Sequence, residues 1–510
     1  MRLSRSIAHL HVHTTYSVRD GLAQLEDLVD AAAADHQPAI ATTDHGSLGA
    51  TWRMAGLCAK AGLKYIPGAE LYLAFGDRRT REGLAAPVGA SEGAGSDAET
   101  ASTGTKKYQH LTVLAASQTG WRNLLLVSNA AHDPEAYWSK PRADMDLLAE
   151  HADGLIVLTG CAGGPVAGRL LRGEPEIADA NLARLVEAFG PQRVFVEVMD
   201  HGIEAERRIL PDLVDLARRY GLRVVATNDC HYTMPGQHTA HDALLCLADG
   251  EKTLSSPDRW RFDGSGYHLR SAAEMRALFD DQPSTEEACD ATLLVAEMVE
   301  KEVIPEARMH LPRFPLPEDV TAERRLFELV KAGARDRYGD PYPEVVRDRL
   351  RHEYRVVTEK GLADYFLILA DVIAWARSHG IRVGPGRGSA GGSVISYCLG
   401  IITIDPIRYG LLFERFLSPD RVGMPDIDTD FEQGRREEVF GYLTAKYGVD
   451  YTAHIGTYTL QLTNAALRNA GRVLDDPGLG ARLAAKVPSG PGGKPLSFAV
   501  LDDEQSPSGA

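Results

Sequence analysis

The chain has 510 residues and a formal net charge of -16, with 44% hydrophobic and 25% charged residues. This composition is ordinary for a globular protein, and the length allows about two to four domains. The acidic balance argues against a protein that coats nucleic acid, because phosphate contacts need Lys and Arg, unless those contacts are local or made by another chain. No apolar run reaches the roughly 20 residues of a membrane span, and the N-terminus lacks a signal-peptide core, so we expect a cytoplasmic protein without membrane contact. The six cysteines form no CxxC pair, which gives no indication of a disulfide framework or a zinc ribbon.

The chain up to residue 230 alternates short apolar runs with amphipathic stretches. The strand-like runs lie at 8–12, 39–42, 65–67 with 71–74, 111–115, 155–158, 194–198 and 224–226. The helical stretches between them lie at 22–35, 47–61, 121–132, 177–189 and 205–220. Such alternation predicts an α/β fold with a parallel sheet or a β/α barrel, and about seven strands favour the barrel.

The remainder of the chain is less regular. Residues 76–105 are rich in Gly, Ala, Ser and Thr without an apolar period, which predicts a mobile insertion. Residues 285–380 are mostly helical in pattern, at 286–302, 322–338, 343–360 and 365–379, and the proline-rich stretch 305–317 is a plausible domain boundary. Residues 383–470 return to an α/β pattern, and the Pro/Gly/Ser-rich tail 487–510 is expected to be disordered.

Histidines and acids of the first part fall at the ends of the apolar runs. These residues are His11, His13, Asp20, Asp44, His45, Glu70, His110, Cys161, Asp229 and His231. In a β/α barrel most of them would face the mouth at the carboxyl ends of the strands. Taken singly, each residue also has a structural interpretation that involves no metal. The HxH histidines would be hydrogen-bonded within the protein, Asp44 would be a helix N-cap, and Cys161 would be a small buried residue. Recurrence at successive strand ends favours a site for zinc, manganese or iron that hydrolyses a phosphoester.

A second group of residues occupies 383–431. A glycine-rich turn, Gly384-Pro385-Gly386-Arg387-Gly388-Ser389, opens this stretch, and Asp426, Asp428 and Asp430 close it at alternate positions. Glycines let a backbone approach a phosphate closely, and alternate residues of a strand share one face, where carboxylates attract a divalent cation. The alternatives are a strand–helix loop capped by Ser389 and a solvated edge strand. The two features together predict phosphoryl or nucleotidyl transfer.

The first set of motifs resembles a known domain family. HLHVH, TDHG, GAE and NDCH are similar to the motifs of the PHP (polymerase and histidinol phosphatase) domain, and the phrases HVHTTYSVRDG and VVATNDCHY resemble the version found in bacterial replicative DNA polymerases of the C family. The resemblance implies a distorted seven-stranded barrel that binds up to three Zn²⁺ or Mn²⁺ ions and acts as a 3′–5′ exonuclease. The implied metal ligands are His11, His13, Asp20, His45, Glu70, His110, Cys161, Asp229 and His231.

The second set resembles the palm of the same polymerase family, a nucleotidyltransferase fold similar to that of polymerase β. This resemblance makes Asp426 and Asp428 catalytic ligands of two Mg²⁺ ions and gives Asp430 an accessory role. A deoxynucleoside triphosphate would be held by Gly386, Arg387, Gly388, Ser389, Gly392, Ser393 and Arg415, although a salt-bridging surface helix is the alternative for Arg415. The implied partners are primer–template DNA, a C-terminal polymerase chain and other replisome subunits.

The family resemblance is incomplete. A third catalytic aspartate, carried in the family by a segment resembling KFDFLG, has no counterpart here. We therefore expect four parts: a PHP domain at 1–284, a helical linker region of the palm at 285–382, a partial palm at 383–486 and a tail at 487–510. Three functions stay open: a polymerase active with a complementary chain, a stand-alone metal-dependent phosphoesterase or 3′–5′ exonuclease, and a non-catalytic remnant or half of a split polymerase.

Overall fold

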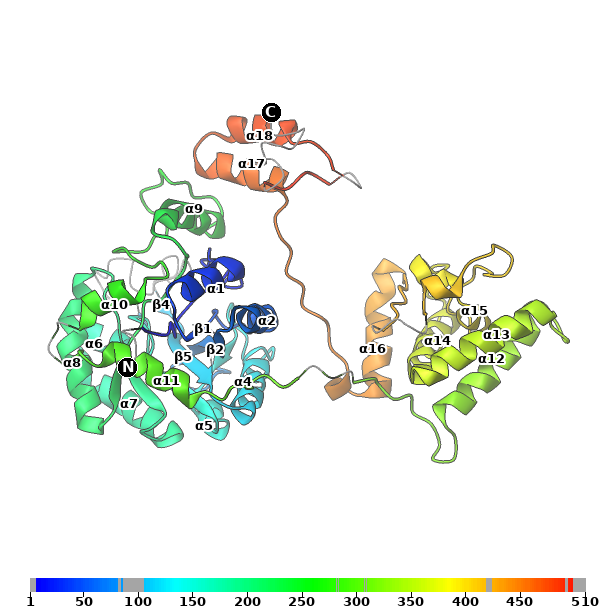
Figure 1. Cartoon of the computed structure of the whole chain (residues 1–510), viewed down its shortest axis with the longest axis horizontal. Helices are drawn as coiled ribbons and strands as arrows, with labels where there is room; N and C mark the ends of the chain where they lie inside the picture. Colours follow the sequence, from blue (N-terminus) through cyan, green and yellow to red (C-terminus); the bar gives the residue numbers. More distant parts are fainter. Residues whose placement is uncertain are drawn as a thin grey trace. The chain divides into compact units, whose positions relative to one another are not determined.

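The computed structural model describes residues 6–80, 84–85, 105–280, 282, 284–306, 308, 310–418, 424–490 and 494–498. The chain forms two compact units (Figure 1), Met1–Glu306 together with Leu460–Ala510 and, separately, Ala307–Thr459. Among these described residues, no helix is both long enough and apolar enough to cross a membrane.

A single mixed sheet forms the centre of the first unit. Its strands follow the order β1 (Ala39–Thr42), β2 (Lys64–Leu73), β5 (Gln109–Ala115), β7 (Leu155–Leu158), β8 (Val194–Val198) and β9 (Arg223–Ala226), and β6 (Arg142–Ala143) also pairs with β2. All neighbours are parallel except at β5, which runs antiparallel to both β2 and β7. The predicted runs from residue 39 onward are therefore confirmed as strands, whereas the run 8–12 forms only isolated bridges, and the one reversed strand was not foreseen.

The N-terminal segment closes this sheet into a barrel. His9 forms a parallel bridge with Ile40 of β1, and Val12 forms one with Cys230, which follows β9. The backbone N–H of Ala41 donates to the His9 carbonyl at 2.8 Å, and that of His13 donates to the Cys230 carbonyl at 2.7 Å. The segment thus lies between the first and last strands of the sheet, which confirms the expected distorted barrel.

Helices surround the barrel (Figure 1) and bury one stripe each against it. They are α1 (Leu25–Ala34), α2 (Thr51–Ala61), α4 (Gln118–Ala131), α5 (Met145–Glu150), α6 (Ala167–Leu171), α7 (Pro175–Phe189), α8 (Glu204–Tyr220), α10 (Ala272–Phe279) and α11 (Ala288–Met298). In α7 the buried residues Ala178, Leu182, Leu185 and Phe189 recur at helical spacing, and each large one contributes about 2 kcal/mol by burial. Pro175 begins this helix at a position where no N–H is needed.

The two described ends of the predicted insertion 76–105 make different contacts: one contacts the barrel, and short strands at its flanks pair with each other. Arg78 Nη1 lies 3.1 Å from Asp144 Oδ2, and β3 (Leu84–Ala85) pairs antiparallel with β4 (Thr105–Lys106). The rest of the predicted mobile segment lies outside the described residues.

The first unit extends beyond the expected boundary at residue 284 and includes a C-terminal helical hairpin. Helix α11 packs on β9, so the unit continues to Glu306. Helices α17 (Thr463–Val473) and α18 (Pro477–Lys486) pack closely because Gly471 meets Gly480, where a Cβ on Gly471 would lie 2.7 Å from the Gly480 Cα. Helix α17 contacts α9 (His238–Ala248), and the Leu254 N–H donates to the Val473 carbonyl at 3.0 Å. Most of the predicted disordered tail lies outside the part of the chain that the structure describes.

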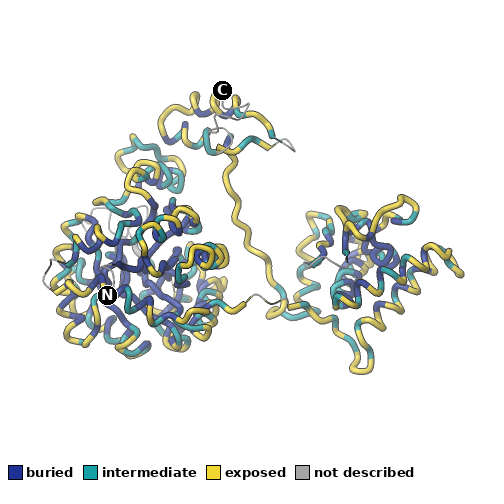
Figure 2. Tube along the Cα trace, in the orientation of Figure 1, coloured by how far each residue is buried: buried dark blue, intermediate teal, exposed yellow. Residues whose placement is uncertain are grey.

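The second unit is helical, with a buried core formed by the inward faces of its helices (Figure 2). Its helices are α12 (Ala322–Tyr338), α13 (Glu344–Glu359), α14 (Ala363–Ser378), α15 (Val394–Cys398) and α16 (Arg436–Tyr447), with short 3-10 turns that include η2 (Gly388–Gly392) and η3 (Phe413–Arg415). Among its described residues, β structure is limited to one antiparallel bridge between Val383 and Phe431. The expected α/β pattern of 383–470 is therefore wrong for these residues. The stretch 424–430 is extended, but no neighbouring strand pairs with it beyond the single bridge.

Candidate metal centre

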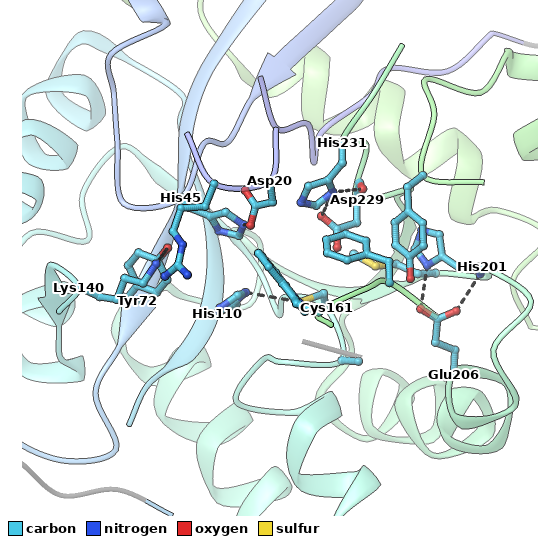
Figure 3. A pocket seen from close by; sticks show the side chains of 16 residues that line it. Asp20, His45, Tyr72, His110, Lys140, Cys161, His201, Glu206, Asp229 and His231 are labelled. Carbon is cyan, nitrogen blue, oxygen red and sulfur yellow. Dashed lines mark hydrogen bonds and ion pairs between the residues drawn. The ribbon is translucent and has the colours of Figure 1, made fainter. Parts of the chain in front are cut away.

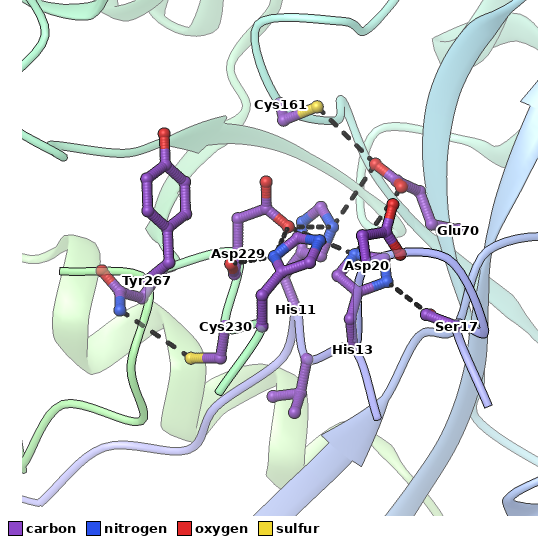
Figure 4. A network of polar contacts seen from close by, with 12 residues as sticks. His11, His13, Ser17, Asp20, Glu70, Cys161, Asp229, Cys230 and Tyr267 are labelled. Atoms are coloured by element: carbon purple, nitrogen blue, oxygen red, sulfur yellow. Dashed lines mark hydrogen bonds and ion pairs between the residues drawn. The ribbon is translucent and has the colours of Figure 1, made fainter. Parts of the chain in front are cut away.

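The barrel brings the predicted ligands together at its mouth (Figure 4). His11 and His13 alternate on the N-terminal segment, His45 follows β1, and Asp229 and His231 follow β9. His110 stands at the beginning of its strand rather than at the end. Because β5 is antiparallel to β2, its first residues pair with the last residues of β2, and His110 lies opposite Tyr72. The reversed strand therefore delivers His110 to the same mouth as the other ligands.

Glu70 of β2 is the central carboxylate of this cluster and is only 1% exposed. Its Oε2 lies 2.7 Å from His45 Nδ1, 3.1 Å from His110 Nδ1 and 3.6 Å from His13 Nε2. Its Oε1 lies 3.4 Å from His11 Nε2. One carboxylate therefore faces four imidazoles, an arrangement suited to a carboxylate that bridges metal ions.

Two aspartates complete the carboxylate set. Asp229 Oδ1 lies 3.2 Å from His13 Nε2 and 3.4 Å from His11 Nε2, and Asp20 Oδ2 lies 3.2 Å from His45 Nε2. Three groups of possible ligand atoms each lie within 4.8 Å of one another: His13 with His45 and His231, His11 with His13 and Glu70, and His45 with Glu70 and His110.

Several buried ligand atoms of this cluster make no hydrogen bond, although some of them lie at ion-pair distance from one another. They are His11 Nε2, His13 Nε2, Asp20 Oδ1, His45 Nδ1, Glu70 Oε2, Asp229 Oδ1 and His231 Nε2. Unsatisfied buried polar atoms are rare in folded proteins, since each costs about 1–3 kcal/mol. Seven that converge on one centre fit a site that binds divalent metal ions.

Hydrogen bonds at the opposite ring nitrogens orient the imidazoles. His11 Nδ1 faces the Glu197 carboxylate at 2.7 Å, His13 Nδ1 faces Ser17 Oγ at 3.0 Å, and His231 Nδ1 faces the Asp229 carbonyl at 2.8 Å. In each case Nδ1 carries the proton and the lone pair of Nε2 is left for a metal.

Glu197 is a functional residue that sequence reasoning missed. It lies on β8, in the run VFVEV, where it is 2% exposed among apolar neighbours. A glutamate in an otherwise fully buried strand was the available signal, because a buried carboxylate requires partners.

The electrostatics of the cluster favour ionised carboxylates. Burial disfavours the charged forms, but the surrounding imidazoles outweigh it and hold the pKa of Glu70 well below its usual range. Burial also opposes protonation of His45, yet the carboxylates of Asp20 and Glu70 raise its pKa to about 10. At His231 burial dominates and lowers the pKa to about 4, which keeps that imidazole neutral and able to bind metal.

Cys161 and Asp44 have different roles. Cys161 Sγ lies 3.6 Å from Glu70 Oε1 and 3.9 Å from His110 Nδ1, so it belongs to the cluster. The Asp44 carboxylate instead accepts hydrogen bonds from the Thr14 N–H at 2.7 Å and from Ser17 Oγ at 2.8 Å. Asp44 therefore fixes the loop after His13 and is neither a ligand nor the N-cap of α2, whose N-cap residue is Ala50.

A pocket opens onto the centre (Figure 3). Six of the candidate ligands line it, and the remaining wall includes Arg19, Tyr72, Lys140, His201, Glu206, Trp260, Phe262 and Tyr267. The pocket makes the metal centre accessible to a ligand and gives that ligand both cationic and aromatic side chains to contact.

The three aspartates of the second unit lie on an extended stretch. Asp426 and Asp430 are exposed and Asp428 is half-buried, while Ile427 is buried and its N–H donates to the Tyr365 hydroxyl at 3.2 Å. Arg387 connects this stretch to the glycine-rich turn, with Nη1 3.0 Å from Asp428 Oδ2 and Nε 3.3 Å from Asp430 Oδ1.

The glycine-rich turn has an exposed part and a buried part. Ser389 and Arg387 are exposed, and Gly386 and Gly388 adopt φ values of 92° and 69° that other residues rarely adopt. Gly392 is buried against the Leu412 carbonyl, where a Cβ would lie only 2.4 Å from the oxygen.

Ser393, rather than Ser389, caps the following helix. Its Oγ donates to the buried Glu353 at 2.9 Å and accepts from the Ser396 N–H at 3.1 Å. Arg415 is exposed in the 3-10 turn η3, where a longer surface helix had been an alternative.

Family models and curated relatives identify the chain's class. Residues 9–201 match the model described as the PHP domain, and residues 324–505 match the model described as the bacterial DNA polymerase III alpha NTPase domain. DNA polymerase III subunit alpha of Mycobacterium tuberculosis (strain ATCC 25618 / H37Rv) is 43% identical over 472 residues, which cover 92% of this chain and 39% of that protein. The corresponding subunit of Thermus aquaticus is 36% identical over 545 residues, covering 96% of this chain and 43% of its own.

These matches confirm the resemblance found in the sequence: the chain combines a PHP domain with a DNA polymerase III alpha NTPase domain. Over more than nine tenths of its length the chain is similar to curated bacterial DNA polymerase III alpha subunits, and it spans about two fifths of the length of those relatives. Among solved structures, an amidohydrolase from Chromobacterium violaceum covers 53% of this chain and 96% of its own at 13% identity, with a TM-score of 0.28, which is too low to define fold or function.

Proposed function

We propose that the barrel is a metal-dependent phosphoesterase that acts on DNA as a 3′–5′ exonuclease. The observation that carries this proposal is the convergence of buried imidazole and carboxylate atoms that make no hydrogen bond on one centre around Glu70 and His13. Up to three Zn²⁺ or Mn²⁺ ions would be held by His11, His13, Asp20, His45, Glu70, His110, Cys161, Asp229 and His231. When bound, such ions lower the pKa of a coordinated water and polarise the phosphate.

The protein's own residues hold the ligand atoms in place. Glu197 and Ser17 keep Nδ1 of His11 and His13 protonated, so that Nε2 of both rings faces the centre. The His231 ring is fixed in the same sense by the backbone carbonyl of Asp229. This arrangement is set before any substrate enters, which is the condition for efficient electrostatic catalysis.

The test is the release of label from a single-stranded oligonucleotide in Mn²⁺ or Zn²⁺, with label at the 3′ end in one sample and at the 5′ end in another. We expect stepwise shortening from the 3′ end, and a loss of at least about 100-fold in His11→Ala, because one ligand and its link to Glu197 disappear. His132→Ala is the matched control, since His132 is exposed on the surface. An oligonucleotide left intact in both metals, or cleavage equal in wild type and His11→Ala, would refute the proposal.

A second candidate function is template-directed nucleotidyl transfer in DNA replication, together with a further polymerase chain. The observation that favours it is the position of the exposed Asp426 and the half-buried Asp428 on one extended stretch, which Arg387 connects to the glycine-rich turn through Asp428 and Asp430. We propose that the two aspartates bind Mg²⁺ and that a deoxynucleoside triphosphate is bound by Gly386, Arg387, Gly388, Ser389 and Arg415. The other two residues expected at this site, Gly392 and Ser393, are buried and would support the turn from below. The partners would be primer–template DNA and replisome subunits in the cytoplasm.

Primer extension tests this second function. The chain is mixed with a polypeptide that carries the remaining length of a relative, and we expect nucleotide incorporation that Asp426→Asn and Asp428→Asn abolish. Incorporation that persists in both variants, or none with the wild-type mixture, would rule out this role for the two aspartates.

A further inference from the structure

The pocket at the metal centre extends across the barrel mouth from one side to the other. The barrel is a ring of the N-terminal segment, β1, β2, β5, β7, β8 and β9, in that order. Since several strands separate β2 from β9 along the ring in both directions, the two strands lie on opposite sides of the mouth. Tyr72 belongs to β2, whereas Tyr267 is joined to the segment after β9 by the hydrogen bond from the His231 N–H to the Tyr267 carbonyl, at 2.8 Å. Both tyrosines line the same pocket, so the pocket spans the mouth with the metal ligands between them.

The β2 side of the pocket carries an ammonium group. Lys140 Nζ donates to the Tyr72 hydroxyl at 3.2 Å and lies 5.0 Å from the centroid of that ring. The Tyr72 ring in turn lies 5.8 Å from the His45 ring and 5.6 Å from the His110 ring. Tyr72 thereby holds the Lys140 charge beside the metal ligands (Figure 3), and lysine is a common point-charge ligand of phosphate.

The β9 side of the pocket is a wall of aromatic rings. The half-buried Phe262 ring lies 4.7 Å from the ring of His231, 4.9 Å from that of Tyr267 and 6.0 Å from that of Trp260. Tyr267 is itself stacked on His201 at 4.0 Å with an interplanar angle of 7°. This wall is therefore rigid, and its ring in the pocket borders a candidate metal ligand directly.

The two sides differ mainly in Lys140 and Phe262, since the aromatic wall also carries a cation, Arg19, 6.0 Å from the Trp260 ring, and the β2 side also carries the Tyr72 ring. This difference limits the kind of ligand that fits. A small phosphate monoester would place its whole charge at the metal ions and would leave Lys140 and the aromatic wall without a role on opposite sides. A ligand that uses both sides has a ring on one side of the reacting phosphate and a further negative charge on the other. The unpaired end of a nucleic acid strand has this pattern, and stacking of a base on an aromatic side chain contributes about 1–3 kcal/mol.

We propose that the pocket binds a single-stranded nucleic acid end across the mouth, with the terminal base against Phe262 and the neighbouring, uncleaved phosphate at Lys140. This inference rests on the proposed phosphoesterase function and names two residues, Phe262 and Lys140, that set its preference among strand ends. In the reaction, a water oxygen bonds to the phosphorus of the last linkage, and the bond from that phosphorus to the 3′ oxygen of the preceding nucleotide breaks. The products are a nucleoside 5′-monophosphate and a strand one nucleotide shorter with a free 3′-hydroxyl. A base-paired end does not fit this pocket, because its terminal base is stacked within the duplex.

The experiment compares matched substrates on the full chain in Mn²⁺. For the base contact, the pair is a single strand with a normal 3′-terminal nucleotide and the same strand without the terminal base. For the phosphate contact, the pair is a trinucleotide with two linkages and a dinucleotide with one. We expect wild-type kcat/KM to favour the first member of each pair by about tenfold.

The variants separate the two contacts. Phe262→Leu keeps apolar packing against His231 but loses the ring. We expect this variant to hydrolyse the strands with and without the terminal base about equally well, through a change in KM, and to keep the wild-type preference for the trinucleotide over the dinucleotide. Lys140→Met should lose the preference for the trinucleotide over the dinucleotide and keep the wild-type preference for a strand with its terminal base. Phe327→Ala and Lys60→Met are controls, because both side chains are exposed on the surface and neither lines the pocket.

The same substrate pairs are titrated against the Mn²⁺-loaded protein by fluorescence anisotropy. One outcome is that no strand is hydrolysed, but Kd shows both preferences in the wild type and the loss of one preference in each variant. In that case the proposed phosphoesterase function is refuted, and the proposed binding of a strand end is supported. If strands are hydrolysed or bound with ratios near one in wild type, or with ratios that neither variant alters, the strand site is overturned.

Discussion

Glu197 determines which nitrogen of His11 faces the metal centre. Its Oε1 accepts hydrogen bonds from His11 Nδ1 at 2.7 Å and Thr227 Oγ1 at 2.6 Å, and its Oε2 accepts one from the Gly160 N–H at 2.8 Å. These donors fix the carboxylate itself, so the carboxylate can fix the imidazole. A metal site of this kind therefore depends on a residue that never contacts the metal.

Replacing Glu197 with Gln should weaken metal binding about 10- to 100-fold, because both carboxylate oxygens accept hydrogen bonds and the amide NH2 would face a donor, His11 or the Gly160 N–H, in either orientation. The affinity is measured by titrating Mn²⁺ into the chelator-treated protein. Glu187→Gln is the control, since Glu187 is exposed on α7. Equal affinity in wild type and Glu197→Gln would show that His11 is oriented without this carboxylate.

His201 is a buried imidazole with an acceptor at each nitrogen. Nδ1 lies 2.8 Å from Glu206 Oε1, and Nε2 lies 3.0 Å from the Asn228 carbonyl, so both nitrogens carry protons. Burial opposes this charge, but the hydrogen bond and the charge of Glu206 outweigh it and raise the pKa of His201. The charged ring ties the start of α8 to the loop that carries Asp229.

Stability should depend on pH through this pair. Because the pKa of His201 is raised on folding, the pair contributes fully below the unfolded pKa of about 6.5, and the contribution is lost as pH rises through the folded pKa. We expect Glu206→Gln to lower the free energy of unfolding by about 2 kcal/mol at pH 6, with a smaller difference at higher pH. Urea unfolding with a chelator present measures this, and the exposed Glu204→Gln is the control. A difference that stays constant from pH 6 to 9 would contradict the assignment.

Helix packing in the second unit depends on one glycine. A Cβ at Gly333 of α12 would lie 1.9 Å from the Cys398 carbonyl oxygen of α15. Nothing lies within 4 Å of the corresponding position at Gly441 of α16. The two helical glycines therefore form a matched pair with opposite expectations.

Gly333→Ala should lower the free energy of unfolding by about 2 kcal/mol, because the two backbones are forced apart. Gly441→Ala should raise it by about 1 kcal/mol, the usual gain from replacing glycine in an open helix position. Thermal unfolding of both variants tests the pair. A stabilising Gly333→Ala would mean that α12 and α15 do not pack in this way.

Much of the barrel and its centre could be predicted from local patterns. The strands are short apolar runs, and the ligands His13, His45 and Asp229 follow those runs closely, so their proximity follows from the fold. The direction of β5 could not be predicted, because an apolar run does not indicate whether a strand is parallel or antiparallel to its neighbour. This direction nevertheless brings His110 to the mouth. The second-unit stretch 424–430 alternates like a strand, but alternation reports only which side chains are buried, and strand formation also requires a neighbouring strand.

The division into two compact units implies that metal binding at the barrel centre stabilises the barrel unit only. All ligands of the proposed centre lie in the unit that comprises Met1–Glu306 and Leu460–Ala510. A ligand that binds only the folded state adds about 2.7 kcal/mol of stability at a hundred times its Kd. The contribution applies to the cooperative unit that contains the site.

Calorimetry of the full chain should therefore show two transitions, of which one moves. We expect a chelator to lower the melting temperature of the barrel unit and Mn²⁺ to restore it, while the transition of Ala307–Thr459 stays in place. Asp229→Asn should abolish the response of the first transition, because it removes a carboxylate from the centre, and Gly333→Ala should shift only the second. A chelator that lowers both transitions together would mean that the two units unfold as one and that the metal stabilises the chain as a single body.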